Sequence, residues 1–397
     1  MVAEPVERRR IGSVDALRGA VMIIMALDHV RDFVHRRAMT QSPTNLATTT
    51  AAVFLTRWVT HVCMPVFLLT AGMGAFYWRR NGQRSLGDLS WFLLTRGLWL
   101  IVLELTAMRF VFDFAFGSDL PVLLITLWAL GASMIVLAAL VYLPPTTLAA
   151  LSIGVLCLHN LLDPVRARTF GAAAWLWNVV HQPGVFTVGG LTVVVGYPVL
   201  SLVAIMAAGY SLAAFVTLGD DVGRTRVRRI GWTLTIAFVV LRALNSYGDP
   251  VRWSHQASLT LTMLSFLNVT KQPASLDFVL MTIGPALLFL AWIDTRHLTP
   301  RHPLMVFGRV PLFYFLGHFF VAHVIFMTLM WTQYGIFTLR PPPSMGTPTT
   351  MFPPDLGFPL WFAYIVWLVV VGVMYPLCRW YGDLKQRHRH QTWTSYL

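Results

Sequence analysis

The sequence carries little charge and few cysteines. Only 12% of its 397 residues are Asp, Glu, Lys or Arg, whereas 56% are hydrophobic, and the mean hydropathy is +0.63. Soluble domains carry about twice that share of charge, so the composition excludes a soluble globular protein. The three cysteines, Cys63, Cys157 and Cys378, fall in separate apolar segments, which argues against a disulfide framework or a zinc site.

Several motif classes are also missing. The glycines that fall in loops, such as Gly82 and Gly219, are isolated, so no phosphate-cradling glycine loop is indicated. No nucleic-acid-binding motif accompanies the basic pI of about 10.3, and we expect no nucleic-acid partner. The first apolar segment contains Asp15 and Arg18, unlike a cleavable secretory signal, so we expect it to remain as a membrane span.

Apolar stretches long enough to cross a bilayer core of about 30 Å recur along the chain. The sequence therefore predicts an all-α, polytopic integral membrane protein. We expect about ten transmembrane helices, at residues 11–34, 51–78, 90–112, 120–143, 146–162, 193–217, 230–247, 276–294, 304–331 and 358–380. The predicted organisation is a basic N-terminus (1–10), a single transmembrane domain (11–380) and a basic tail (381–397).

The distribution of arginine predicts the topology. Arginine clusters in short connections and at the chain ends, at residues 8–10, 79–84, 224–229, 296–301 and 379–389. With ten spans these clusters share one side, which the positive-inside rule makes cytoplasmic, together with both termini. Most of the net charge of +13 then faces lipid headgroups, and we expect a multi-pass protein of the inner (cytoplasmic) membrane. The longer connections, 163–192, 248–275 and 332–357, would lie outside.

One face of the first span is charged along its whole length. Eleven steps of about 100° bring His29 to within roughly 20° of Arg18, about 16 Å further along the helix axis. Asp15, Asp28 and Asp32 lie on the same arc of roughly 140°. Placing one such group at the bilayer centre costs about 2.5 to 3.5 kcal/mol, so these side chains usually line a bundle interior or a wet cavity.

Three interpretations of this face are open. Asp15 and Arg18 are spaced as a structural ion pair at i,i+3. His29 could act in acid–base chemistry, with Asp32 orienting one ring nitrogen. Alternatively, Asp28, His29 and Asp32 could form the proton relay of a small-molecule transporter. A non-catalytic subunit of an envelope-assembly pathway is a further, structural, class.

Several blocks are similar to those of a known family. The run from Ser13 to Gly19 with Leu27-Asp28-His29, the run Met64-Pro65-Val-Phe67, and Gly308-Arg309-Val-Pro311 resemble the bacterial heparan-alpha-glucosaminide N-acetyltransferase-like membrane proteins. The blocks His159-Asn160-Leu-Leu-Asp163 and Phe266 through Leu276 resemble that family too. The spacing from Arg18 to His29 is also similar to the Arg-x10-His signature of the broader transmembrane acyltransferase superfamily.

The resemblance implies transfer of an acetyl or similar acyl group from cytoplasmic acyl-CoA to an outward-facing sugar or glycan. His29 would be the general base or the acyl carrier, assisted by Asp28 and Asp32, and no metal is implied. Arg18, with Asp15, would aid donor binding, and Arg79, Arg80 and Arg309 are candidates for the CoA phosphates. The catalytic histidine proposed for the lysosomal animal enzyme has no counterpart in residues 41–56 of this chain.

Other polar residues are candidates for binding the acceptor. His61 in the second span could face His29, and His318 in the ninth could line a cavity. On the outer side, sugar could hydrogen-bond or stack in the segment with Asn245, Asp249 and Trp253. Lys271 and Asn268 could bind an anionic acceptor or anchor at headgroups. A homo-oligomer is possible.

Overall fold

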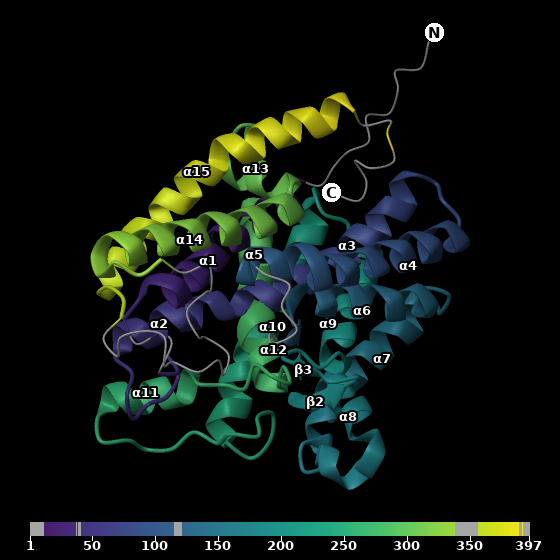
Figure 1. Ribbon diagram of the computed structural model, residues 1–397. Helices are drawn as coiled ribbons and strands as arrows, with labels where there is room; N and C mark the ends of the chain where they lie inside the picture. The colour runs from purple at the N-terminus through teal and green to yellow at the C-terminus, as the bar shows by residue number, and fades with distance from the viewer. Residues whose placement is uncertain are drawn as a thin grey trace.

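The structure is a computed structural model that describes residues 12–36, 38, 41–114, 121–337, 356–388 and 391. The chain is mostly helical, with 73% of residues in helices and 4% in strands. Helix α1 (Gly12–Val34) lies inside the bundle and contacts α3, α12, α13, α14 and α15. Figure 1 shows α14 (Pro311–Tyr334) and α15 (Leu360–Arg387) running along one side of the molecule.

Six helical stretches are long and apolar enough to cross a membrane. They are Ala51–Asn81, Leu86–Phe112, Pro145–Leu162, Leu276–Ile293, Pro311–Tyr334 and Leu360–Arg387. The first joins α2 (Ala51–Val59) to α3 (Cys63–Asn81), and the second contains α4 (Leu86–Leu103) and α5 (Arg109–Asp113). These stretches are compatible with the predicted multi-pass membrane protein.

The third stretch begins with α7 (Pro145–Leu158), and the fourth is α12 (Leu276–Ile293). Besides α1, the helices outside the six stretches are α6 (Thr126–Leu140), α8 (Ala174–Val180), α9 (Leu200–Phe215), α10 (Asp221–Leu244), α11 (Leu259–Leu267) and α13 (Pro303–Arg309). Helix α10 begins nine residues before the predicted span, since the Asp220 side chain accepts a hydrogen bond from the Gly223 amide at 2.5 Å and caps it.

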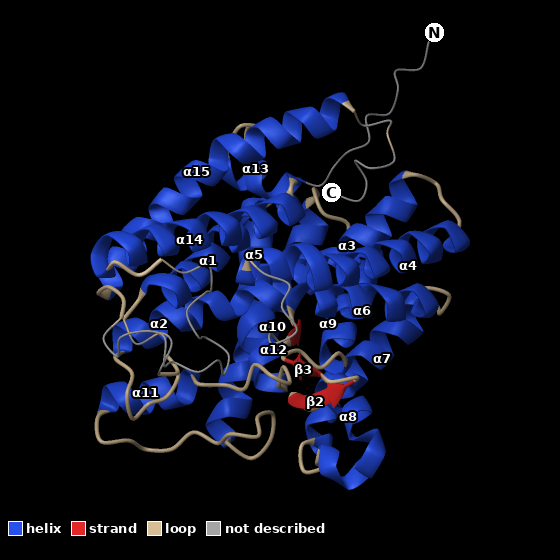
Figure 2. Ribbon diagram, in the orientation of Figure 1, coloured by secondary structure: helices blue, strands red, loops and turns tan. Residues whose placement is uncertain are grey.

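A three-stranded sheet departs from the all-α prediction. Strands β1 (Val122–Leu124), β3 (Leu191–Val195) and β2 (Gly184–Val188) pair in that order, β1 parallel and β2 antiparallel to β3. Gly189 and Gly190 both have positive φ, 56° and 82°, and make the two-residue turn between β2 and β3. Figure 2 shows β2 and β3 in red, with β2 next to α8. Two stretches predicted as entirely helical, 120–143 and 193–217, therefore each begin with a strand.

The predicted span 304–331 is broken into two helices. Helix α13 ends at Arg309, and α14 starts at Pro311, which lacks the amide hydrogen that a continuous helix would need. Helix α13 instead packs closely on α1. A Cβ at Gly19 would overlap the Leu304 carbonyl, and one at Gly308 would overlap the Asp15 carbonyl, so both positions require glycine. This contact fixes the N-terminal half of α1.

Candidate functional site

A cavity of about 670 Å³ lies beside the C-terminal half of α1. Its wall includes side chains from α1, from α2 and the turn that follows it, from the start of α6, from α14 and from the segment 268–272. The polar residues that line it include Asp28, His29, Arg31, Asp32, Arg57, His61, Asn268 and Lys271. The predicted face of α1 therefore meets residues that lie more than 200 positions away in the sequence.

An ion-pair network joins α1 to α2 at this cavity. Asp28 is paired with Arg57 through one carboxylate oxygen, and its other oxygen lies 3.1 Å from Nη2 of Arg31. The same Nη2 donates to Asp32 at 2.6 Å. Arg31 is buried, with a side chain 2% exposed, so both its charge and that of Asp28 are compensated within the protein.

His29 stands next to this network with its ring on the cavity wall. Its ring packs on Phe319 of α14, with centroids 4.0 Å apart, and lies 5.3 Å from the ring of His318. The ring makes no hydrogen bond with any residue that the structure describes. Asp32, expected to orient this ring, places its oxygen on Arg31 instead. The His29 nitrogens are thus accessible to a molecule in the cavity.

His61 and Lys271 also face the cavity. His61 is 3% exposed, and its Nδ1 is buried without a hydrogen-bond partner among the described residues. The Lys271 ammonium lies 5.7 Å from the ring centroid of Tyr197 and forms no ion pair with a described residue. Asn268 lines the same wall and donates to the Thr44 carbonyl at 3.1 Å. His61, which was expected to face His29, lies on the same cavity wall, and so do Asn268 and Lys271; their binding roles stay predictions.

The segment that carries Asn268 and Lys271 is anchored at both ends. Asp249 accepts hydrogen bonds from the Thr270 amide and hydroxyl near one end and from the Ser275 hydroxyl near the other, at 2.6 to 2.9 Å. At the other end the Leu276 amide donates to Asn160 at 2.9 Å, and His159 Nε2 lies 2.9 Å from the Ala274 carbonyl oxygen. The predicted Asp249 is thus a support for the cavity wall.

Asn245 and Trp253 belong to the same support. Asn245 ends α10 in the left-handed conformation, and its side chain exchanges two hydrogen bonds with the Trp253 backbone. The Trp253 indole donates to the Arg242 carbonyl at 2.7 Å. The side chains of Asn245, Asp249 and Trp253 do not line the cavity, and the segment reaches its wall only through Val251.

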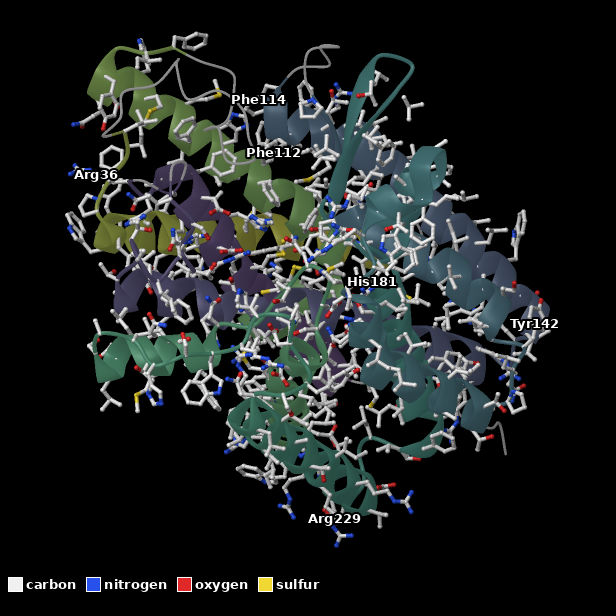
Figure 3. All side chains as sticks on the ribbon, turned by 90° about the horizontal axis from the view of Figure 1, so that it is seen from below. Arg36, Phe112, Phe114, Tyr142, His181 and Arg229 are labelled. Atoms are coloured by element: carbon white, nitrogen blue, oxygen red, sulfur yellow. The ribbon has the colours of Figure 1, made fainter. Side chains whose placement is uncertain are left out.

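His318 does not line the cavity either. It is fully buried between Tyr314, Phe315, Phe319 and His29, and its Nδ1 lies 2.9 Å from the Tyr314 carbonyl oxygen. Phe112 of α5 lines the cavity together with Phe319 and packs edge-on against it. Figure 3 shows Phe112 and Phe114 side by side with the α14 helix.

The predicted donor-binding residues lie at the other half of α1. Arg18 is 3.7 Å from Asp15, as the i,i+3 spacing predicts, and also donates to the Thr70 carbonyl of α3. Arg79 and Arg80 lie nine and ten residues after Thr70, near the end of α3, and Arg309 ends α13, which packs on α1 at Asp15. None of these arginines lines the cavity at His29.

Sequence reasoning missed Arg57 and Tyr197. Arg57 lies four residues before His61, so one helical turn places both on the same side of the second span, and that spacing was a usable signal. Tyr197 follows β3, and only the sheet brings it to Lys271. Across the described residues, no group of three or more His, Cys, Asp or Glu side chains is arranged to hold a metal ion.

His35 directly follows the last residue of α1 and lies near Arg31 of the ion-pair network. Burial, together with the positive charges of Arg31 and Arg36, lowers the pKa of His35 to about 4. Its imidazole is therefore neutral at pH 7.

Neither the comparison with protein-family models nor that with curated proteins finds a match for this chain. The resemblance to the heparan-alpha-glucosaminide N-acetyltransferase-like proteins therefore stays a prediction. Any functional conclusion has to come from the chemistry of the cavity and of α1.

Proposed function

We propose that this chain is a membrane-embedded acyltransferase, which moves an acetyl or similar acyl group from cytoplasmic acyl-CoA to a sugar or glycan on the outer face. The observation that carries the proposal is the position of His29. Its ring lies on the wall of a polar cavity and makes no hydrogen bond with a described residue, while the neighbouring Asp28, Arg31 and Arg57 are paired with one another. A histidine so placed is suited to exchange a proton with a bound molecule.

The reaction would form a carbon–oxygen or carbon–nitrogen bond and break the thioester carbon–sulfur bond. In the direct route, His29 takes the proton of the acceptor hydroxyl or amine as that group attacks the thioester carbonyl, and coenzyme A leaves as its thiol after protonation. In the covalent route, a ring nitrogen of His29 first receives the acyl group and the acceptor then removes it. Both routes require an exposed ring nitrogen.

The donor would bind at the opposite half of α1. Arg18, Arg79, Arg80 and Arg309 supply guanidinium groups there, and such groups match phosphate geometry. Along α1 this end lies about 16 Å from His29, at a rise of about 1.5 Å per residue, so the long pantetheine arm of the donor would have to run beside the helix. The acceptor would occupy the cavity beside Asn268, Lys271 and His61.

The test is acyl transfer by the purified protein in nanodiscs, with labelled acetyl-CoA and a panel of sugars and oligosaccharides. We expect His29→Asn to lower product formation by about 10²-fold or more, the usual loss when a general base or nucleophile is removed. The matched control is His255→Asn, which changes an exposed histidine of an outer loop. Equal activity of His29→Asn and the native chain would overturn the assignment of His29.

Donor binding gives a readout that does not depend on the acceptor. Acetyl-CoA should raise the melting temperature saturably, and less so in Arg18→Ala than in Arg228→Ala, which changes an exposed arginine on α10. The transporter alternative has weaker support, since both carboxylates of its relay are held by Arg31 and Arg57. Movement of a solute without consumption of a thioester would favour that alternative.

A further inference from the structure

His318 is a buried histidine of α14 to which the proposed transfer reaction gives no role. It lies between Tyr314, one helical turn earlier on α14, and His29 of α1, and its ring contacts the rings of both. A buried imidazole has lost its hydrogen bonds with water, so each of its nitrogens needs a partner inside the protein. The partners of the two nitrogens therefore decide what this ring can do.

One nitrogen of His318 has a partner and the other has none. Nδ1 lies 2.9 Å from the Tyr314 carbonyl oxygen. A carbonyl oxygen only accepts hydrogen bonds, so Nδ1 carries the proton, and in the neutral ring Nε2 is an acceptor. Nε2 is buried and has no hydrogen-bond partner among the described residues. A buried acceptor without a donor costs free energy, so a donor for Nε2 is to be expected nearby.

The Tyr314 hydroxyl is poorly placed to be that donor. The Tyr314 ring is stacked on His318, with an angle of 17° between the ring planes and centroids 5.3 Å apart. The Nε2 lone pair lies in the imidazole plane, whereas the hydroxyl lies in the nearly parallel plane of the tyrosine ring. The hydroxyl itself is buried without a hydrogen-bond partner among the described residues. Stacking thus keeps the two groups out of line.

His29 is better placed. Its ring centroid lies 5.3 Å from that of His318, and the two ring planes are tilted by 43°. At this separation one nitrogen of each ring can come within the roughly 3 Å of a hydrogen bond when the rings turn edge to edge. Phe319 packs on both rings, with centroids 4.0 Å from His29 and 4.7 Å from His318. The two imidazoles are therefore held together against one aromatic side chain.

We propose that His318 is the positioning residue of His29. Its Nε2 accepts a hydrogen bond from one ring nitrogen of His29, and the other nitrogen of His29 keeps its lone pair and faces the cavity. This inference rests on the proposed acyl transfer, since a general base or nucleophile needs that tautomer. His318 then has the role that was expected of Asp32, whose oxygen is held by Arg31. When the cavity-facing nitrogen takes a proton, the hydrogen bond to His318 is kept.

The first test is solid-state NMR of the full chain in nanodiscs with isotope-labelled histidine, and it needs no acyl transfer. We expect a through-space correlation between a ring nitrogen of His29 and Nε2 of His318, which disappears in His318→Gln. The Nε2 signal should have the shift of a hydrogen-bonded acceptor, lose it in His29→Ala and keep it in Tyr314→Phe. Loss of that shift in Tyr314→Phe, or its persistence in His29→Ala, would overturn the proposal.

The second test separates positioning from packing through the rate of acyl transfer. His318→Leu fills the space without an acceptor, and we expect kcat to fall about tenfold or more, a loss typical of partners that orient a histidine. The KM for the acceptor sugar should not change. His318→Gln places an amide oxygen close to the position of Nε2 and should restore most of the rate. His323→Leu, the same change at another buried histidine of α14, should leave kcat unchanged.

The two tests distinguish a failure of the positioning role from a failure of the proposed function. Transfer by the native chain with an unchanged kcat in His318→Leu, or an equal loss of rate in His318→Gln, would overturn the role of His318 alone. A histidine pair detected by NMR in a chain that transfers no acyl group would overturn the proposed function instead.

Discussion

Two buried charge clusters in this protein differ in how completely their groups are satisfied. Arg242 is closed in on all sides. Its guanidinium donates to four backbone carbonyls, those of Phe266, Val251, Ser265 and Asn268, and lies within 4.0 Å of both Asp249 and Asp277. The cluster around Asp28 instead opens onto the cavity, with His29, His61 and Lys271 facing the space. Both clusters contain a buried arginine, so buried charge alone does not identify a functional site.

The two clusters also differ in the sign of their excess charge. Arg242 lies near two carboxylates. In the second cluster, among the described residues, Arg31 and Arg57 are paired with Asp28 and Asp32, and Lys271 adds a third positive charge on the cavity wall. The first cluster uses its charge to hold loops in place. The second cluster has one more positive than negative side chain, beside the accessible ring of His29. A ligand bound in the cavity could interact with both groups. The contrast predicts different responses to substitution.

The largest effect on folding is expected for Arg242→Met. The substitution removes a donor from four carbonyls and the counter-charge from two buried carboxylates, and breaking a buried pair in this way typically costs about 3 to 5 kcal/mol. The melting temperature in nanodiscs should fall strongly, and protease should cut within 248–275. Arg228→Met, at an exposed position, is the control. An unchanged melting temperature for Arg242→Met would remove the distinction between the clusters.

An intermediate effect is expected at the Asp28–Arg57 pair. Asp28→Asn should destabilise the protein more than Arg57→Gln does, because it deprives two arginines of a counter-charge whereas Asp28 keeps Arg31 in the other variant. The double variant should recover part of the loss, with a coupling energy of about 1 to 3 kcal/mol. Thermal unfolding of all four proteins measures this coupling. Strictly additive losses would show that the pair is not a stabilising contact.

A smaller, pH-dependent effect is expected at His35. Its pKa is about 4 in the folded protein against 6.5 for a free histidine, so the unfolded chain binds a proton more readily between these values. Stability should therefore fall as the pH drops from about 6.5 to about 4 and stay flat above that range for this group. His35→Gln should flatten the slope of melting temperature against pH. A slope identical to that of the native chain would contradict the lowered pKa.

The smallest effect on folding is expected for Lys271→Met. Within the described residues its ammonium has only the contact with the Tyr197 ring, so stability should change by no more than about 0.5 kcal/mol. Binding of an acceptor in the cavity should change more than the melting temperature does. The comparison with Arg242→Met then separates a cation kept for a ligand from one kept for the fold. A large loss of stability in Lys271→Met would place it among the structural charges.

Some of this site could be predicted from local sequence. The period of α1 places Arg18, His29 and the three aspartates on one face, and the i,i+3 spacing predicts the Asp15–Arg18 contact that the structure shows at 3.7 Å. The approach of His61 to the cavity wall beside His29 was likewise expected, whereas that of Asn268 and Lys271 was not. The functions of these residues stay predictions.

Other parts required the folded chain. The sheet was missed because valine-rich runs such as 193–195 are apolar enough to be read as helix, although Gly189-Gly190 is a hairpin signal. Pro311 in the sequence signals the break between α13 and α14, but the prediction placed both helices in the single span 304–331. Asp249 and Trp253 were assigned to sugar because a polar loop does not reveal which of its hydrogen bonds are already made.

The sequence by itself determined that the chain is mostly helical and apolar, with a charged face on α1, because composition and helical period are local properties. Only the tertiary structure decided which of those charges are paired with other groups of the protein. Asp28 is paired with an arginine 29 residues away. Asp32 accepts a hydrogen bond from Arg31 and not from His29. Asn268, which lines the same cavity, lies more than 200 residues further along the chain. Hydrogen bonds and ion pairs depend on distances of a few ångströms between remote segments, and no local pattern encodes those distances.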